Sequence, residues 1–173
     1  KEKTLKNVYA ERVIDRIEKN VGLERCVFSR ADVMASPESF RDTEFIFSTW
    51  GMPSFTEEEI KMCFPSLKCV FYAAGTVQSF ARPFLNRGVK VFSAWAANGV
   101  PVAEYTVSQI ILANKGFFAQ TRLMAEKRLD DAKRRKAACI GNYGEKIGLV
   151  GCGMIGSLVA RMLQSYELEV LVF

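Results

Sequence analysis

The sequence predicts an α/β protein built on parallel β-sheets, and two observations carry this prediction. Short apolar runs that suit buried strands alternate along the chain with segments of helical periodicity, and the connections between them are short. Near the end of the chain an apolar strand leads directly into three spaced glycines and then into another helix-forming segment. Such alternation is typical of βαβ units, in which crossover helices join parallel strands.

The first part of the chain is expected to form a parallel sheet with short helices. Apolar residues recur at helical spacing over 7–20, which predicts a helix that ends before Gly22. Residues 37–41 and 78–87 are also expected to be helical. Short runs rich in β-branched and aromatic residues predict buried strands between these helices. The expected strands are 26–29, 44–48, 67–72 and 89–92.

Local patterns mark two further helical regions. Thr56 and Glu59 match a capping box, in which each side chain accepts a backbone N–H of the other residue, so a helix should start there and run to about Cys63. The segment 102–136 has a helical pattern throughout with an interruption near Gly116, which predicts a long connecting helix and then a basic amphipathic helix. The expected domains are 1–98 and 99–173.

The glycine motif is the strongest functional signal in the sequence. Gly151, Gly153 and Gly156 stand at G-x-G-x-x-G spacing after the apolar run 147–150. The next segments have the pattern of a helix and of a second strand, so the full β-turn-α-β context is present. Here the first glycine permits the tight turn, the second lets the backbone approach a pyrophosphate, and the third allows close packing of helix on strand. The sequence therefore predicts a dinucleotide-phosphate site at the start of a helix.

Only two strands of this second unit stand before the end of the sequence, at Phe173. A complete doubly wound fold usually has about six strands. The sequence is therefore expected to be a fragment of a longer protein, with an incomplete nucleotide-binding domain, and its first residues also have the character of a cut end.

The composition is that of an ordinary globular protein, with 49% hydrophobic and 25% charged residues. No apolar run approaches the length of about 20 residues that a membrane helix needs. The five cysteines form no C-x-x-C pair and there is no histidine to share a metal with them, so reduced, mostly packed thiols in a cytoplasmic protein are expected, and no metal site.

The net charge of +5 is concentrated in the basic segment 127–136. Nucleic-acid binding and a solvated helix face are the two interpretations of such a run. Acidic residues are interleaved with the basic ones and no aromatic residue accompanies them, which favours the solvated face. A nucleic-acid partner is therefore not expected.

Three pieces of the chain resemble the D-isomer-specific 2-hydroxyacid dehydrogenases. These are Ala73-Ala-Gly-Thr76 at a strand end, Asn98-Gly-Val-Pro-Val-Ala-Glu104 at a helix start, and the segment 143–156 with the glycine motif. Their order and separation match the family over essentially the whole chain. The resemblance implies a flavodoxin-like substrate domain followed by a Rossmann nucleotide-binding domain, which is incomplete here.

The resemblance also implies roles for individual residues. Ala74, Gly75 and Thr76 would hold the substrate carboxylate through their backbone N–H groups, and Thr76 and Val102 would lie beside the nicotinamide. Thr76 as a simple turn residue and Val102 as a packing residue are the alternatives. The cofactor-binding residues of the glycine loop would be Gly151, Gly153, Met154, Ile155 and Gly156, with Met154 and Ile155 donating N–H groups to the pyrophosphate.

The activity implied is hydride transfer between NAD, with NADP not excluded, and a small 2-hydroxy or 2-oxo acid. The family's catalytic arginine, glutamate and histidine have no counterpart in this sequence, which contains no histidine. The fragment alone is therefore expected to be inactive and to bind the cofactor weakly at most. A non-enzymatic, NAD-sensing corepressor of the same family is the alternative, and the family implies a homodimer.

Overall fold

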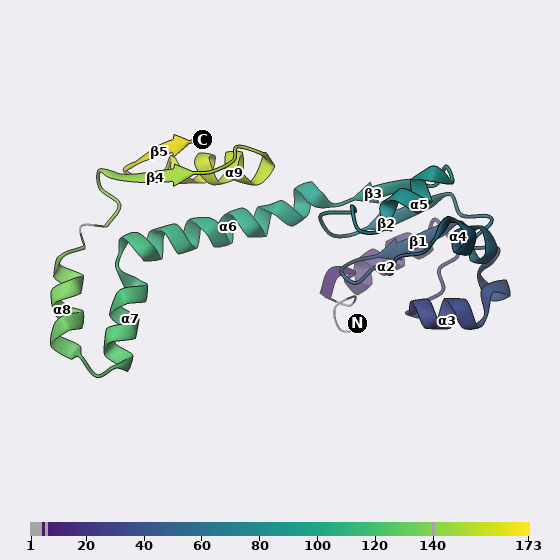
Figure 1. Cartoon of the computed structure of the whole chain (residues 1–173), viewed down its shortest axis with the longest axis horizontal. Helices are drawn as coiled ribbons and strands as arrows, with labels where there is room; N and C mark the ends of the chain where they lie inside the picture. The colour runs from purple at the N-terminus through teal and green to yellow at the C-terminus, as the bar shows by residue number, and fades with distance from the viewer. Residues whose placement is uncertain (1–4, 6, 140) are drawn as a thin grey trace. The chain divides into compact units, whose positions relative to one another are not determined.

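A computed structural model describes residues 5, 7–139 and 141–173 of the chain. The chain divides into two compact units, with bounds Lys1–Trp95 and Ala96–Phe173 (Figure 1). Within the described residues, no helix combines the length and apolar character needed to cross a membrane. Each unit contains its own parallel sheet, as the sequence predicts.

The first unit contains a three-stranded parallel sheet. Its strands are β1 (Phe45–Ser48), β2 (Cys69–Tyr72) and β3 (Lys90–Ser93), which lie in the order β1-β2-β3. The register aligns residue 48 with 72 and residue 72 with 93, so the three strands end at one edge of the sheet. These strands lie within the expected segments 44–48 and 67–72 and, apart from Ser93, 89–92.

Two helices connect these strands, and other helical segments precede β1. The elements are α2 (Glu11–Glu18), α3 (Arg30–Ala35), the short 3₁₀ helix η1 (Pro37–Phe40), α4 (Glu57–Cys63) and α5 (Ala81–Asn86). The predicted capping box is present: the Glu59 N–H donates to Thr56 Oγ1 at 3.2 Å and the Thr56 N–H donates to Glu59 Oε2 at 3.0 Å. α2 is shorter than the expected helix over 7–20 and has no buried residue.

The core of the first unit lies between the sheet and helices α4 and α5. Val70 of β2, Ile60 of α4 and Phe84 of α5 are almost completely buried in it. Because strand side chains alternate between faces, Phe71 points to the other face. There its ring stacks between those of Phe47 and Phe92, with centroids 5.2 and 5.3 Å away.

The predicted strand over 26–29 is wrong. Residues 22–29 are irregular, Val27 and Phe28 are 43% and 44% exposed, and Ser29 instead caps the start of α3 by accepting the Asp32 N–H. A four-residue apolar run forms a strand only where a neighbour takes up its backbone groups. Among the described residues β1 pairs only with β2, so its other edge is unpaired and the run 26–29 does not join it.

Three helices come first in the second unit: α6 (Trp95–Asn114), whose first residue still belongs to the first unit, α7 (Phe117–Ala125) and α8 (Leu129–Ala137). Gly116 interrupts the helical stretch as predicted, with a positive φ of 71°. Two expectations need correction. α6 begins before Val102 and continues through Pro101, and a second break occurs at Lys127, whose φ is 60° although it is not a glycine.

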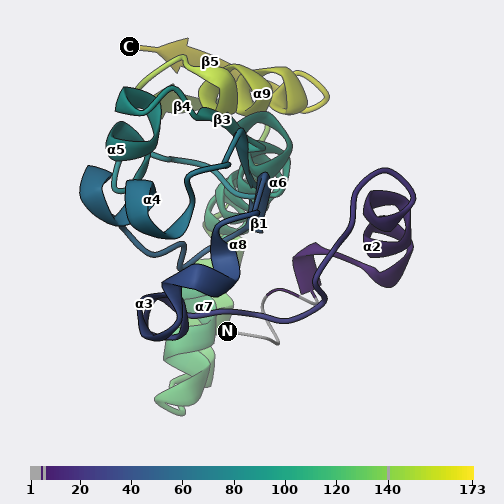
Figure 2. The same cartoon turned by 90° about the vertical axis from the view of Figure 1, so that its right-hand side faces the viewer.

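The remainder of the second unit is the β-turn-α-β element that the glycine motif predicts. β4 (Glu145–Leu149) and β5 (Leu168–Val172) pair in parallel, and α9 (Met154–Leu163) lies beside them (Figures 1 and 2). Val159 and Leu163 of α9 are buried together with Ala103 of α6. This small core fixes the start of α9 at the carboxyl end of β4.

Candidate cofactor and substrate loops

The loop between β4 and α9 depends on two glycines for its shape. Gly151 has a φ of +92°, a conformation that residues with a Cβ rarely adopt. A Cβ on Gly156 would overlap the backbone carbonyl oxygen of Gly151. The first and third glycines of the motif are therefore required by the turn and by the close approach of helix and loop.

Gly153 is different, because nothing inside the chain requires a glycine there. Its φ of −70° and ψ of −165° lie in the extended region open to any residue. A Cβ built on Gly153 would have no heavy atom within 4 Å. The missing side chain leaves open space in front of the helix start, and a side chain would occupy that space.

The start of α9 has backbone N–H groups that no N-cap side chain accepts from. Gly153 is the N-cap residue and provides no side-chain acceptor for the first-turn N–H groups. In an α-helix these N–H groups have no intrahelical partner, and the helix dipole adds partial positive charge at this end. Such N–H groups, here those of Met154 and Ile155, have the chemistry that a phosphate oxygen needs.

Backbone contacts hold most of the glycine loop. The Gly151 N–H donates to the Phe173 carbonyl at 2.8 Å, and the Phe173 N–H donates to the Leu149 carbonyl at 2.9 Å. One side chain contributes as well: the Ser157 hydroxyl donates to the Cys152 carbonyl at 3.0 Å. The glycine motif does not include Ser157, although a hydroxyl in the first turn of the helix, just after the motif, is a signal for such a contact.

The second candidate loop, Ala73–Thr76, follows β2 in the first unit. The Ala73 N–H donates to the Ser48 carbonyl at 2.8 Å and so extends the ladder between β1 and β2. Thr49 Oγ1 donates to the Ala73 carbonyl at 3.2 Å. Ser93 Oγ, at the end of β3, lies within hydrogen-bonding distance of the carbonyls of Ala74, at 3.0 Å, and Gly75. The sequence indicates this loop through the resemblance but indicates neither hydroxyl contact.

The residues that are expected to contact substrate or cofactor, in this loop and at Val102, differ in their exposure. Ala74 is fully buried, Gly75 is half-buried and Thr76 is exposed. Thr76 Oγ1 accepts the Gln78 N–H at 3.5 Å, a local contact of the kind that turn residues make. Val102 on α6 is 41% exposed and lies outside the buried cluster of its unit.

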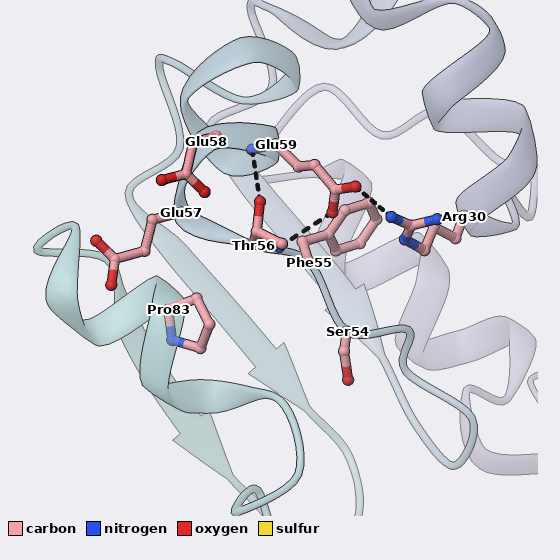
Figure 3. A pocket seen from close by; sticks show the side chains of 8 residues that line it. All are labelled: Arg30, Ser54, Phe55, Thr56, Glu57, Glu58, Glu59 and Pro83. Atoms are coloured by element: carbon pink, nitrogen blue, oxygen red, sulfur yellow. Dashed lines mark hydrogen bonds and ion pairs between the residues drawn. The ribbon is translucent and has the colours of Figure 1, made fainter.

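A pocket lies beside α4, and no residue of either candidate loop lines it (Figure 3). This pocket of about 420 Å³ contains three consecutive glutamates, but Glu59 caps Thr56 and pairs with Arg30. Asn86 donates to Glu57 at 2.6 Å. Two of the three carboxylates are therefore occupied by the chain itself. Across the described residues, no cluster of three or more histidine, cysteine or acidic side chains is placed to hold a metal ion.

Comparisons with known proteins show which solved structures share this fold. No protein-family model matches the sequence, and no match is found among curated proteins. Among solved structures, D-mandelate dehydrogenase from Rhodotorula graminis has a TM-score of 0.74 at 12% identity over 95% of this chain and 52% of its own. NAD-dependent formate dehydrogenase from Staphylococcus aureus, in complex with NAD, has a TM-score of 0.64 at 20% identity over 98% of this chain and 50% of its own.

A third similar structure is an acyclic imino acid reductase in complex with NADPH and D-Arg, with a TM-score of 0.64 at 19% identity over 94% of this chain and 51% of its own. The chain spans about half the length of these proteins. At such identities the likeness concerns the fold. The expected α/β fold class, and the resemblance to the D-2-hydroxyacid dehydrogenase fold, are confirmed at that level.

Proposed function

We propose that this chain belongs to an NAD(P)-dependent oxidoreductase that transfers a hydride between a nicotinamide cofactor and a small 2-hydroxy or 2-oxo acid. The observation that carries the proposal is the unfilled space at Gly153. The chain has no conformational or packing need for a glycine there, yet a pyrophosphate in front of α9 would need one. The fold shared with dehydrogenase structures supports this assignment.

The cofactor would be held mainly by backbone groups. Gly151, Gly153 and Gly156 would shape the loop, and the N–H groups of Met154 and Ile155 would bind the pyrophosphate. Thr76 and Val102 would lie beside the nicotinamide, which supplies the hydride-transfer chemistry when bound. Either NAD or NADP fits the proposal, and the similar structures include one complex with each type of cofactor.

The substrate would be held at the Ala73–Thr76 loop. Backbone N–H groups of Ala74, Gly75 and Thr76 would bind the carboxylate, as charge-assisted hydrogen bonds to an anion are stronger than neutral ones. We assign no catalytic residue among the 173, because an imidazole is the usual proton donor near neutral pH and the sequence has no histidine. The proposal also includes a cytoplasmic homodimer.

The experiment measures turnover and cofactor binding by the whole protein, meaning the oxidoreductase to which this chain is proposed to belong. NADH or NADPH oxidation would be followed by absorbance with glyoxylate, pyruvate and longer 2-oxo acids, alongside cofactor binding by calorimetry. Turnover with a 2-oxo acid is the expected result. Tight cofactor binding with no turnover over a broad panel of acids would favour the corepressor alternative, and failure to bind either cofactor would refute both.

A further inference from the structure

The carbonyl groups of three successive loop residues all meet hydroxyl groups from neighbouring strands. Thr49, one residue after β1, donates to the Ala73 carbonyl, and Ser93, the last residue of β3, reaches those of Ala74 and Gly75. The two hydroxyls therefore hold the loop from both sides of β2. We propose that Ser93 is a positioning residue that orients the N–H groups of this loop toward the carboxylate of the acid substrate, an inference that rests on the proposed function.

The orientation follows from the geometry of the peptide bond. In a trans peptide the C=O of one residue and the N–H of the next point in opposite directions. The described residues contain no cis peptide bond. With the Ala74 and Gly75 carbonyls directed at Ser93, the N–H groups of Gly75 and Thr76 are directed away from it. These two residues are also the more accessible part of the loop, half-buried and exposed.

No described residue accepts a hydrogen bond from the backbone N–H of Gly75 or Thr76. Two adjacent N–H groups that point the same way form a concave anion site, which suits a carboxylate. Such a site depends on the peptide planes keeping their orientation. Ser93 maintains this orientation, because its hydroxyl can hydrogen-bond to the Ala74 and Gly75 carbonyls only when they face it.

Strand pairing holds Ser93 in place. It lies opposite Tyr72 in the ladder between β2 and β3, and the Ala94 N–H donates to the Tyr72 carbonyl at 3.0 Å. The Ser93 hydroxyl is therefore positioned by the sheet rather than by the loop. Thr49 is 2% exposed and is fixed in the same way at the end of β1, so it is the second residue of this arrangement.

The test compares Ser93→Ala with Ser93→Thr, which keeps a hydroxyl. Ser165→Ala is the matched control, because it also removes a hydroxyl that donates to a carbonyl, that of Met162, but in the other unit. For the whole protein, Ser93→Ala should raise the KM for glyoxylate about tenfold, the effect expected for losing a hydrogen bond that orders the site, with the Kd for NADH unchanged. Ser93→Thr should restore most of the loss, and Ser165→Ala should have no effect on KM.

A second measurement does not depend on turnover. Oxalate titration followed by amide NMR should shift the Gly75 and Thr76 resonances, and Ser93→Ala should weaken this binding about tenfold. Unchanged KM and unchanged oxalate affinity in Ser93→Ala would overturn the inference, as would the absence of oxalate shifts at both amides in the unaltered protein. Oxalate binding that depends on Ser93, in a protein that neither binds NADH nor turns over, would support the inference while the proposed function fails.

Discussion

The two candidate loops follow strand ends in the same manner but are held by different means. The glycine loop after β4 depends on backbone groups, since Gly151 supplies the turn, Gly156 the close approach and Phe173 a carbonyl acceptor. The loop after β2 depends on side chains, because the hydroxyls of Thr49 and Ser93 fix its carbonyls. Substitutions should therefore affect the first loop through backbone space and the second through hydroxyl groups.

Gly156→Ala should have the largest effect, because the added Cβ overlaps backbone of Gly151 that cannot move without opening the loop. We expect the free energy of unfolding to fall by about 1–3 kcal/mol and NADH binding by the whole protein to be lost. Denaturant unfolding and calorimetric titration measure the two effects. Gly22→Ala is the control, since a Cβ there meets no atom within 4 Å. Equal behaviour of both variants would contradict the backbone-held loop.

Tyr9→Phe addresses the strand ends beneath the side-chain-held loop. The Tyr9 hydroxyl donates to the Ser48 carbonyl at 3.0 Å, the same carbonyl that accepts the Ala73 N–H. Removing it should reduce the free energy of unfolding by about 0.5–1.5 kcal/mol near neutral pH. No decrease in a denaturant titration would show that this hydrogen bond contributes nothing to stability.

Tyr9 also gives the first unit a dependence on alkaline pH. Burial raises the pKa of Tyr9 to about 12. In the unfolded chain a tyrosine ionises near pH 10. This contribution to stability is therefore fully present below about pH 10 and is lost as the pH rises toward 12. Unfolding measured over this range should show a steeper loss in the unaltered protein than in Tyr9→Phe.

Ser157→Ala should have a smaller effect than Gly156→Ala or Tyr9→Phe. The Ser157 hydroxyl donates to the Cys152 carbonyl, but its loop is already fixed by backbone contacts and the bond is exposed. We expect cofactor affinity to fall about twofold, which corresponds to the lower end of the range for a hydrogen bond. A tenfold loss would show that the glycine loop, like the loop after β2, is held by a hydroxyl.

The same contrast explains which features the sequence could predict. The glycine loop is encoded in consecutive residues, so its turn, close approach and open position follow from spacing alone. The loop after β2 was found only through a resemblance. Thr49 and Ser93 stand 24 and 19 residues from the carbonyls of Ala73 and Ala74, and only the strand register brings them there. No local pattern indicates such contacts.

The secondary-structure predictions that are wrong also concern features that the local sequence does not encode. The run 26–29 has strand-forming residues, but whether it forms a strand depends on a neighbour elsewhere in the chain. The break at Lys127 lacks the glycine or proline that usually marks one. In contrast, the capping box at Thr56 and the break at Gly116 depend only on local backbone chemistry, and both are confirmed.

Gly153→Ala tests the central claim most directly, because it separates the requirements of the fold from those of a ligand. The Cβ has open space and an ordinary backbone conformation, so the free energy of unfolding should stay equal or rise by up to about 1 kcal/mol. NADH affinity of the whole protein should fall at least about tenfold, because the Cβ takes the space of the pyrophosphate. Unchanged NADH affinity in a stably folded Gly153→Ala protein would contradict the account.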